Sequence, residues 1–186
     1  LEDYLMVGEL ALDGTLRPIM GALPVAIQAH KLGFSTVICP KDNAREMRVI
    51  SDIDVIPVSD LETAVSFLNG DTNVDLSIDE DLDTEEIQPE YEKLDMSDIR
   101  GQESAKRAVE ISAAGGHNLL MVGPPGTGKT MLAKRIPTIL PTLSMEEAME
   151  TTMIYSVAGQ TSRKQPLIRQ RPFRSPHHTA SDVAIV

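Results

Sequence analysis

The sequence predicts an α/β protein in two parts joined by an acidic connector. In residues 1–70, short apolar runs typical of buried strands alternate with helical patterns. In residues 117–136, a glycine-rich loop lies between an apolar run and a second helical pattern. Between the two parts, residues 71–98 hold twelve acidic residues and one basic residue, which equals the whole formal charge of -11. We expect an N-terminal segment at 1–70, a linker at 71–93 and a second domain at 94–186.

The N-terminal segment alternates strand and helix signals. Strands are predicted for three apolar runs, at residues 5–10, 35–39 and 54–58. Helices are predicted where apolar spacing follows the helical period, at residues 22–32, 43–49 and 61–68. Asp13 and Gly14 indicate a turn, and Ser59 with Glu62 predicts a capping box for the last helix. We expect a sheet of three or four strands with exposed edges.

The linker at 71–93 lacks apolar periodicity, and its like charges repel one another. As a solvated coil of 23 residues it would span roughly 25 to 30 Å. A regulatory contact with a basic partner is the alternative. The flanking parts carry small opposite charges, because residues 1–70 hold ten acids and five bases while residues 99–186 hold six acids and eleven bases.

Composition excludes several classes of protein. A hydrophobic content of 41% excludes a wholly disordered chain. A single cysteine, Cys39, excludes an intramolecular disulfide, and no segment resembles a signal peptide, so we expect a cytoplasmic protein. No apolar run approaches the ~18 residues of a membrane helix, so we expect no membrane partner. Leu1 is not an initiator methionine, and we expect this chain to be an internal fragment.

Residues 123–130 read Gly-Pro-Pro-Gly-Thr-Gly-Lys-Thr and match the P-loop pattern G-x-x-x-x-G-K-[ST] in full. The context also fits, since residues 119–122 predict a buried strand before the loop and residues 131–136 predict a helix after it. Glycine tolerates backbone angles that turn successive amides toward phosphate oxygens. The loop therefore predicts a site for ATP. An incidental Gly-Pro turn is the alternative.

Two residues of the loop carry the predicted chemistry. Lys129 would reach the β- and γ-phosphates, and the Thr130 hydroxyl would ligate Mg²⁺, which takes few protein oxygens beside phosphate and water. The other predicted nucleotide-binding residues here are Gly123, Pro124, Pro125, Gly126, Thr127, Gly128 and Met131.

Upstream, residues 98–103 precede a helix predicted for residues 103–114. With the loop, this segment resembles the entry of AAA+ ATPases, in which it lies over the adenine. The resemblance implies that Ile99 contacts the base and that Gln102 lies nearby. An ordinary capped helix start is the alternative for either residue.

The C-terminal residues 163–182 form a basic loop with five bases and three prolines. Such a loop could contact a phosphate backbone, although Phe173 is its one stacking aromatic. His177 and His178 have no further ligands at metal spacing, which favours structural roles.

Residues 171–179, Arg-Pro-Phe-Arg-Ser-Pro-His-His-Thr, following this P-loop, resemble the magnesium-chelatase-related AAA+ ATPases of the ComM (YifB) type. Residues 8–43 are similar to the C-terminal half of a Lon-protease-like domain, of the ribosomal S5 domain 2-like fold. The order of the two, Lon-like before ATPase, is that of the ComM type. The resemblance implies an ATPase that uses ATP and Mg²⁺ and acts as a homo-oligomeric ring. It further implies DNA contact and ATP-driven DNA remodelling, in branch migration or natural transformation, by the full-length protein.

Two departures from these families limit the expected activity. Where Lon proteases carry their catalytic lysine, this chain has Leu23 followed by Pro24, so we expect a pseudo-protease scaffold. After Thr130 no apolar run ends in an acid pair, and residues 152–158 are β-like without an acid. We therefore expect this chain to bind ATP but not hydrolyse it. A magnesium-chelatase motor subunit and a nucleotide-regulated binding module remain the alternatives.

Overall fold

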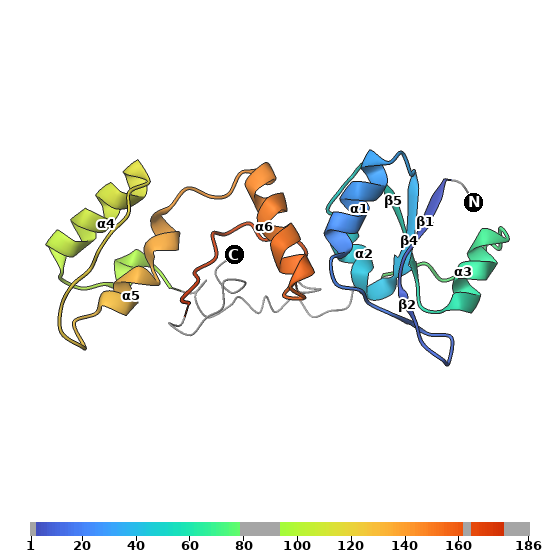
Figure 1. The fold of residues 1–186 in the computed structure, drawn as a ribbon, viewed down its shortest axis with the longest axis horizontal. Coiled ribbons are helices and arrows are strands. Elements are labelled where there is room, and N and C mark those ends of the chain that lie inside the picture. The colour runs from blue at the N-terminus through green and yellow to red at the C-terminus, as the bar shows by residue number, and fades with distance from the viewer. Residues whose placement is uncertain (1–2, 79–93, 162–164, 177–186) are drawn as a thin grey trace. The chain divides into compact units, whose positions relative to one another are not determined.

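The computed structural model describes residues 3–78, 94–161 and 165–176, and the chain divides into two compact units (Figure 1). The first unit comprises residues 1–86 and 144–168, and the second comprises residues 87–143 and 169–186. The sequence places residues 144–168 with the second part, whereas their contacts lie in the first unit. No described helix is both long and apolar enough to cross a membrane.

The first unit is built on a three-stranded parallel sheet in the order β1-β4-β5. Its strands are β1 (Tyr4–Met6), β4 (Thr36–Pro40) and β5 (Asp54–Val58), and in the register Val37 lies between Leu5 and Val55. The predicted run at 5–10 divides into β1 and a short strand β2 (Glu9–Leu10), which pairs with β3 (Leu16–Arg17) in an antiparallel hairpin. The parallel α/β class is confirmed.

Helices cover both faces of this sheet (Figure 1). Val37 and Cys39 of β4 pack with alanines of α1 (Ala22–Lys31) and with α2 (Lys41–Met47). Ile38, between them in sequence, belongs to the cluster of α3 (Leu61–Leu68) on the opposite face. This alternation follows from the period of two in a strand. Burial of Cys39 raises the pKa of its thiol to about 12, so it is a structural residue.

The start of α3 corrects one sequence prediction. Asp60, not Ser59, is the N-cap, and its carboxylate accepts a hydrogen bond from the Thr63 amide at 2.7 Å. The Ser59 hydroxyl instead donates to the Asp60 carboxylate at 2.9 Å. Asp is among the preferred N-caps, and the Thr63 hydrogen bonds, with Ser59 adding to them, lower the pKa of Asp60.

Three apolar residues of the segment 71–78, Val74, Leu76 and Ile78, are partly buried, while its other five residues are exposed. Leu76 packs on the cluster beneath α3, and Ile78 packs on the cluster beneath α1 and α2. The Lys41 ammonium contacts the Asp75 carboxylate at 3.3 Å. The predicted solvated tether therefore does not begin at residue 71, and its remainder, residues 79–93, lies outside the described residues.

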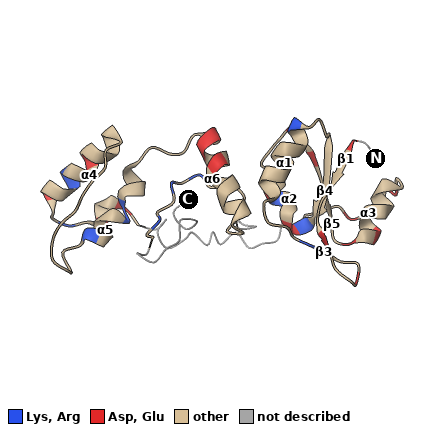
Figure 2. Ribbon diagram, viewed as in Figure 1, with Lys and Arg blue, Asp and Glu red and all other residues tan. Residues whose placement is uncertain are grey.

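The sequence predicts residues 152–158 as β-like, but residues 152–157 belong to helix α6 (Met145–Val157) and Ala158 is its C-cap. A capping box formed by Ser144 and Glu147 begins this helix, and Figure 2 shows the acidic residues of its first turn in red. The helix packs on α1, where the Gly21 amide donates to the Ser156 carbonyl at 3.0 Å. Capping and packing outweigh the strand propensity of its β-branched residues.

In its described residues, the second unit contains helical segments of three to thirteen residues around a small apolar cluster of Ile99, Val109 and Leu132. Its elements are η2 (Met96–Asp98), α4 (Glu103–Gly115), α5 (Lys129–Ala133) and η3 (Ile136–Ile139). The helix predicted at 103–114 is confirmed as α4, while the helix predicted at 131–136 is α5 followed by η3.

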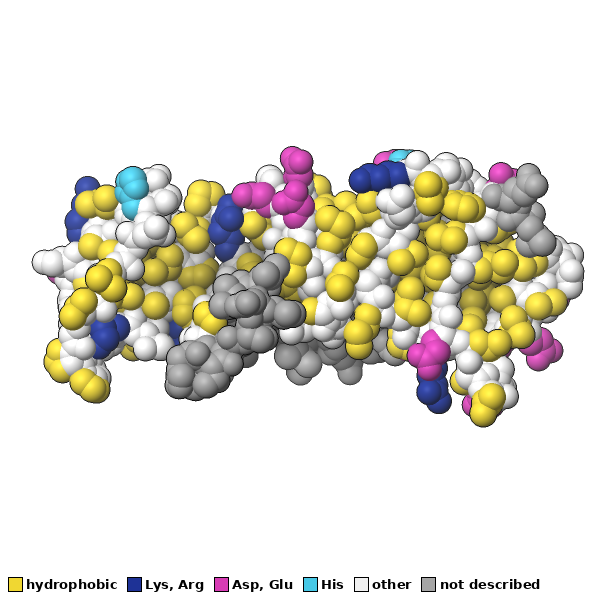
Figure 3. Space-filling model, in the orientation of Figure 1, with side chains coloured by type: hydrophobic (Ala, Val, Ile, Leu, Met, Phe, Trp, Pro, Cys, Tyr) yellow, Lys and Arg dark blue, Asp and Glu magenta, His cyan; other side chains and the backbone are white. Residues whose placement is uncertain are grey.

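The strand predicted at residues 119–122 is absent from the structure. Leu120 and Val122 are each 87% exposed, and Figure 3 shows hydrophobic side chains on the surface of this unit. A strand requires a neighbour for its backbone hydrogen bonds, and both described sheets lie in residues 4–58.

Candidate functional site

The predicted phosphate loop is strongly curved at two of its glycines. Gly126 has φ +81° and Gly128 has φ +85°, in the left-handed region that strains other residues. Gly128 is the N-cap of α5, which begins at Lys129, two residues before the predicted range of 131–136. Gly123, at the start of the loop, does not have a positive φ. The curvature therefore comes from the second half of the loop.

The Lys129 side chain turns back into this loop. Its ammonium group donates to the carbonyls of Gly123 at 2.7 Å and Pro124 at 2.8 Å and lies 3.3 Å from the Thr127 hydroxyl oxygen. The Thr127 hydroxyl donates to the Pro124 carbonyl at 2.9 Å. The cation is thus held at the centre of the loop, in a position to meet an anion that enters it.

A cavity of about 700 Å³ adjoins the loop, within the size range of ligand pockets. The two residues expected near the adenine, Ile99 and Gln102, both line this cavity. Ile99 closes its apolar side, and Gln102 lies at the start of α4 with φ 59°. The loop and the residue after it contribute the following lining residues to the cavity: Gly123, Pro124, Gly126, Thr127, Gly128, Lys129 and Met131. Pro125 and Thr130 do not line it. Most of the predicted binding residues therefore surround one space.

Arg135 holds residues 95–99 in place, which include the expected base contact Ile99, and sequence reasoning missed it. Its guanidinium donates to the Asp95 carbonyl at 2.9 Å, to the Asp98 carboxylate at 3.1 Å and to the Met131 carbonyl at 3.1 Å. The side chain is only 12% exposed. Asp95 also caps η2, and hydrogen bonds from Ser97 lower the pKa of its carboxyl group. Arg135 thus joins η2 to α5 and positions Ile99 beside the cavity.

The position at which Lon proteases carry a lysine is apolar in the structure. Leu23 is fully buried in α1, and its amide donates to the Glu46 carboxylate at 3.3 Å. Pro24 follows in the first turn of the same helix. Neither side chain can act as the amine base of a Ser-Lys peptidase.

Only part of the predicted basic loop is described. Arg169 and Arg174 are exposed, while the Arg171 guanidinium donates to the Pro141 carbonyl at 2.9 Å. Arg163, Lys164, His177 and His178 lie outside the described residues. Among the residues that the structure describes, no three His, Cys, Asp or Glu side chains cluster as a metal site.

Two protein families match the chain. The family described as magnesium chelatase, subunit ChlI, matches residues 95–186, and the family described as subunit ChlI of Mg-chelatase matches residues 1–43. These matches include the phosphate loop and the Lon-like segment respectively.

Individual proteins are similar over the whole chain. The uncharacterised protein YifB of Escherichia coli is 46% identical over 186 residues, which cover 100% of this chain and 35% of YifB. The competence protein ComM of Haemophilus influenzae is 41% identical over 100% of this chain and 36% of its own length. The archaeal Lon protease of Halobacterium salinarum is 34% identical over 131 residues, covering 64% of this chain and 17% of that protease. The chain thus spans about a third of the length of YifB and ComM.

Proposed function

We propose, since this chain belongs to the magnesium-chelatase-related proteins of the ComM type, that it carries the ATP-binding part of an AAA+ ATPase. The observation that carries the proposal is the convergence of Lys129, the two left-handed glycines and Ile99 on one cavity of about 700 Å³. An apolar wall suits a base and a cationic loop suits phosphates.

The residues present fit Mg-ATP. Lys129 would exchange neutral carbonyl acceptors for anionic phosphate oxygens, which form stronger hydrogen bonds with an ammonium group. Thr130, in the first turn of α5 and exposed, offers a hydroxyl oxygen for Mg²⁺. Ile99 and Gln102 would contact the base side. The bound ion would neutralise phosphate charge, while the loop positions the phosphates.

We further propose that this chain binds ATP with negligible hydrolysis. The described residues lining the cavity include no carboxylate that could polarise water or hold the metal ion. Phosphoryl transfer depends on such positioned groups. Phosphate release from Mg-ATP, measured with the 186-residue chain, should remain at background, and turnover that is lost in Lys129→Ala would contradict this.

Calorimetric titration of Mg-ATP into the chain tests the binding site. Wild type should bind saturably, and Lys129→Ala should weaken binding at least 30-fold, from about 2 kcal/mol of lost charge-assisted hydrogen bonding. Lys134→Ala is the matched control, because this exposed lysine does not line the cavity. Circular dichroism verifies that each variant is folded. Equal affinities for the two variants, or no saturable binding by folded wild type, would refute the site.

For the full-length protein we propose a role in ATP-driven DNA remodelling by a homo-oligomeric ring in the cytoplasm. The similarity to a competence protein, ComM, is the comparison that favours this role. Exposed Arg169 and Arg174 supply part of a basic surface. Binding to branched DNA should weaken steeply as salt rises, because each phosphate contact releases counterions. A flat salt response would argue against DNA as partner. The Lon-like segment would serve as a scaffold without peptidase activity.

A magnesium-chelatase motor is the second candidate, favoured by the descriptions of both matching families. Assays of the full-length protein separate the two functions, since ATP-dependent branch migration and metal insertion into a tetrapyrrole share no product. Absence of ATP turnover in both would favour a nucleotide-regulated binding module.

A further inference from the structure

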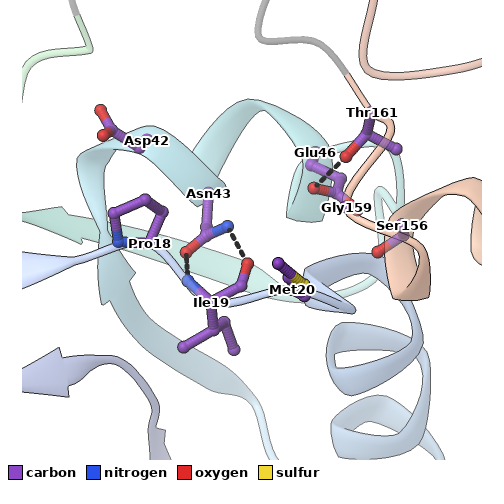
Figure 4. Close-up of a pocket in the computed structure, with 9 residues that line it drawn as sticks. All are labelled: Pro18, Ile19, Met20, Asp42, Asn43, Glu46, Ser156, Gly159 and Thr161. Carbon is purple, nitrogen blue, oxygen red and sulfur yellow. Dashed lines mark hydrogen bonds between the residues drawn. The ribbon is translucent and has the colours of Figure 1, made fainter.

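A second cavity, of about 290 Å³, lies wholly in the first unit (Figure 4). Its walls come from three segments: the residues between β3 and α1, the helix α2, and the end of α6 with the residues after it. Asn43 fixes one wall, because its side-chain amide exchanges two hydrogen bonds with the backbone of Ile19, both at 2.9 Å. The cavity is therefore framed by rigid elements.

A buried hydroxyl in this cavity has no hydrogen-bond partner. Ser156 is 1% exposed, and its Oγ makes no hydrogen bond with any described residue. Figure 4 shows this oxygen directed from α6 toward the cavity. Thr152, one turn earlier, shows the usual alternative, since its hydroxyl donates to the Ala148 carbonyl at 2.7 Å. Buried polar atoms nearly always have partners, so the unpaired Ser156 Oγ is available to hydrogen-bond a group that enters the cavity.

The charge of the lining is negative. Glu46 accepts two long hydrogen bonds, from the Leu23 amide and the Thr161 hydroxyl, both at 3.3 Å. A carboxylate offers about four acceptor sites, so two remain for a ligand. Asp42, one helical turn earlier on α2, also lines the cavity, and none of the described lining residues is Lys or Arg. The ligand is therefore expected to be a cationic donor.

We propose that this cavity binds a primary ammonium group. An ammonium is compact and carries three donors, which suit acceptors on separate elements such as Glu46 of α2 and Ser156 of α6. A planar guanidinium would need acceptors side by side. Ile19 and Met20 provide an apolar wall for the alkyl stem of the ligand. This site lies apart from the phosphate loop in sequence and does not depend on nucleotide binding.

Two sources of an ammonium group are a free polyamine and a lysine side chain of a peptide. The probes are putrescine for the first and N-acetyl-lysine N-methylamide for the second. N-acetyl-norleucine N-methylamide is the uncharged match for the lysine probe. Each is titrated into the 186-residue chain while amide NMR shifts are followed, with the residues of α2 and the end of α6 expected to respond.

Three variants test whether the amine binds at Glu46 and Ser156. Glu46→Gln keeps the shape of the side chain and should weaken amine binding about tenfold, and Ser156→Ala should weaken it severalfold. Asp52→Asn removes one exposed charge away from the cavity and should change affinity less than twofold. Ser156→Ala should not lower the thermal midpoint of the free chain, because the hydroxyl it removes has no partner. This readout distinguishes a ligand-binding hydroxyl from one that only stabilises the fold.

Saturable binding of either amine, with both cavity variants weaker than the control, supports the proposal, and the preferred probe identifies the source. Equal shifts with the norleucine compound would show that the cavity takes apolar groups, which overturns the proposal. Occupation by water only, seen as no saturable response to either amine, also overturns it. If Glu46→Gln fails to fold, unchanged affinity in Ser156→Ala is sufficient to reject the site.

Discussion

Replacing Arg135 with alanine should loosen residues 95–99, which lie beside the proposed nucleotide site. Arg135 ties the Asp95 carbonyl and the Asp98 carboxylate to α5, at 2.9 and 3.1 Å. A hydrogen bond to a charged group contributes about 1.5 to 3 kcal/mol. Because Asp98 is 48% exposed, water replaces part of this interaction, and we expect a loss of about 2 kcal/mol. That loss corresponds to an equilibrium constant for the opening of η2 that is about 30-fold larger.

Hydrogen exchange measured by mass spectrometry on peptides of η2 and α4 detects this change. Arg107→Ala is the control, since Arg107 forms an exposed ion pair with Glu110 on α4 at 2.9 Å. Such helix pairs contribute about 0.3 to 0.5 kcal/mol, so exchange should rise about twofold. If Arg135→Ala raises exchange no more than Arg107→Ala, Arg135 does not hold the segment. Arg135→Ala should weaken Mg-ATP binding less than Lys129→Ala does, since Arg135 acts on the proposed site only through the position of Ile99.

Two further predictions concern the first unit. Asp60→Ala should lower the free energy of unfolding in urea by about 1 kcal/mol through loss of the α3 cap, whereas Ser59→Ala should have little effect, and the reverse order would restore Ser59 as the cap. Hydrogen bonds from Ser77, followed by the contact with Lys41, lower the pKa of Asp75 from 3.8 to about 2. A lowered folded-state pKa stabilises the fold above pH 3.8, and this contribution is lost as pH falls to about 2. Carboxyl NMR shifts of Asp75 should show this low midpoint, and Lys41→Met should raise it, while a midpoint near 3.8 in wild type would contradict the contact.

The sequence predicted those features whose causes are local. The strands β4 and β5 are apolar runs bounded by turn residues, and α1 ends at Lys31 just before Gly33 as expected. The curvature of the predicted phosphate loop has a local cause too, since its residues are consecutive and Gly126 and Gly128 allow its positive φ angles. Each of these signals lies within about ten residues of the structure it causes.

Features with distant causes were missed. Thr152, Ile154 and Val157 are β-branched and suggested a strand at residues 152–158, although the capping pair Ser144 and Glu147 was a readable helix signal. Arg135 lies 37 residues from Asp98, and no local pattern indicates that the two side chains pair. The Glu46 to Thr161 hydrogen bond joins residues 115 apart, so the second cavity could not be predicted. The strand predicted at residues 119–122 is not formed, because an apolar run forms a strand only where a neighbouring strand pairs with it.

The contacts of Lys129 set a condition on how the proposed site takes phosphate. Its ammonium already satisfies its donors on Gly123, Pro124 and Thr127 of its own loop. Nucleotide binding must therefore replace hydrogen bonds rather than add them, and the net gain is the difference between anionic and neutral acceptors. The difference grows with the charge on the entering group, so affinity should rise from AMP to ADP to ATP. Equal affinity for the three nucleotides would place the phosphates away from Lys129, and binding would then rest on the apolar wall that includes Ile99.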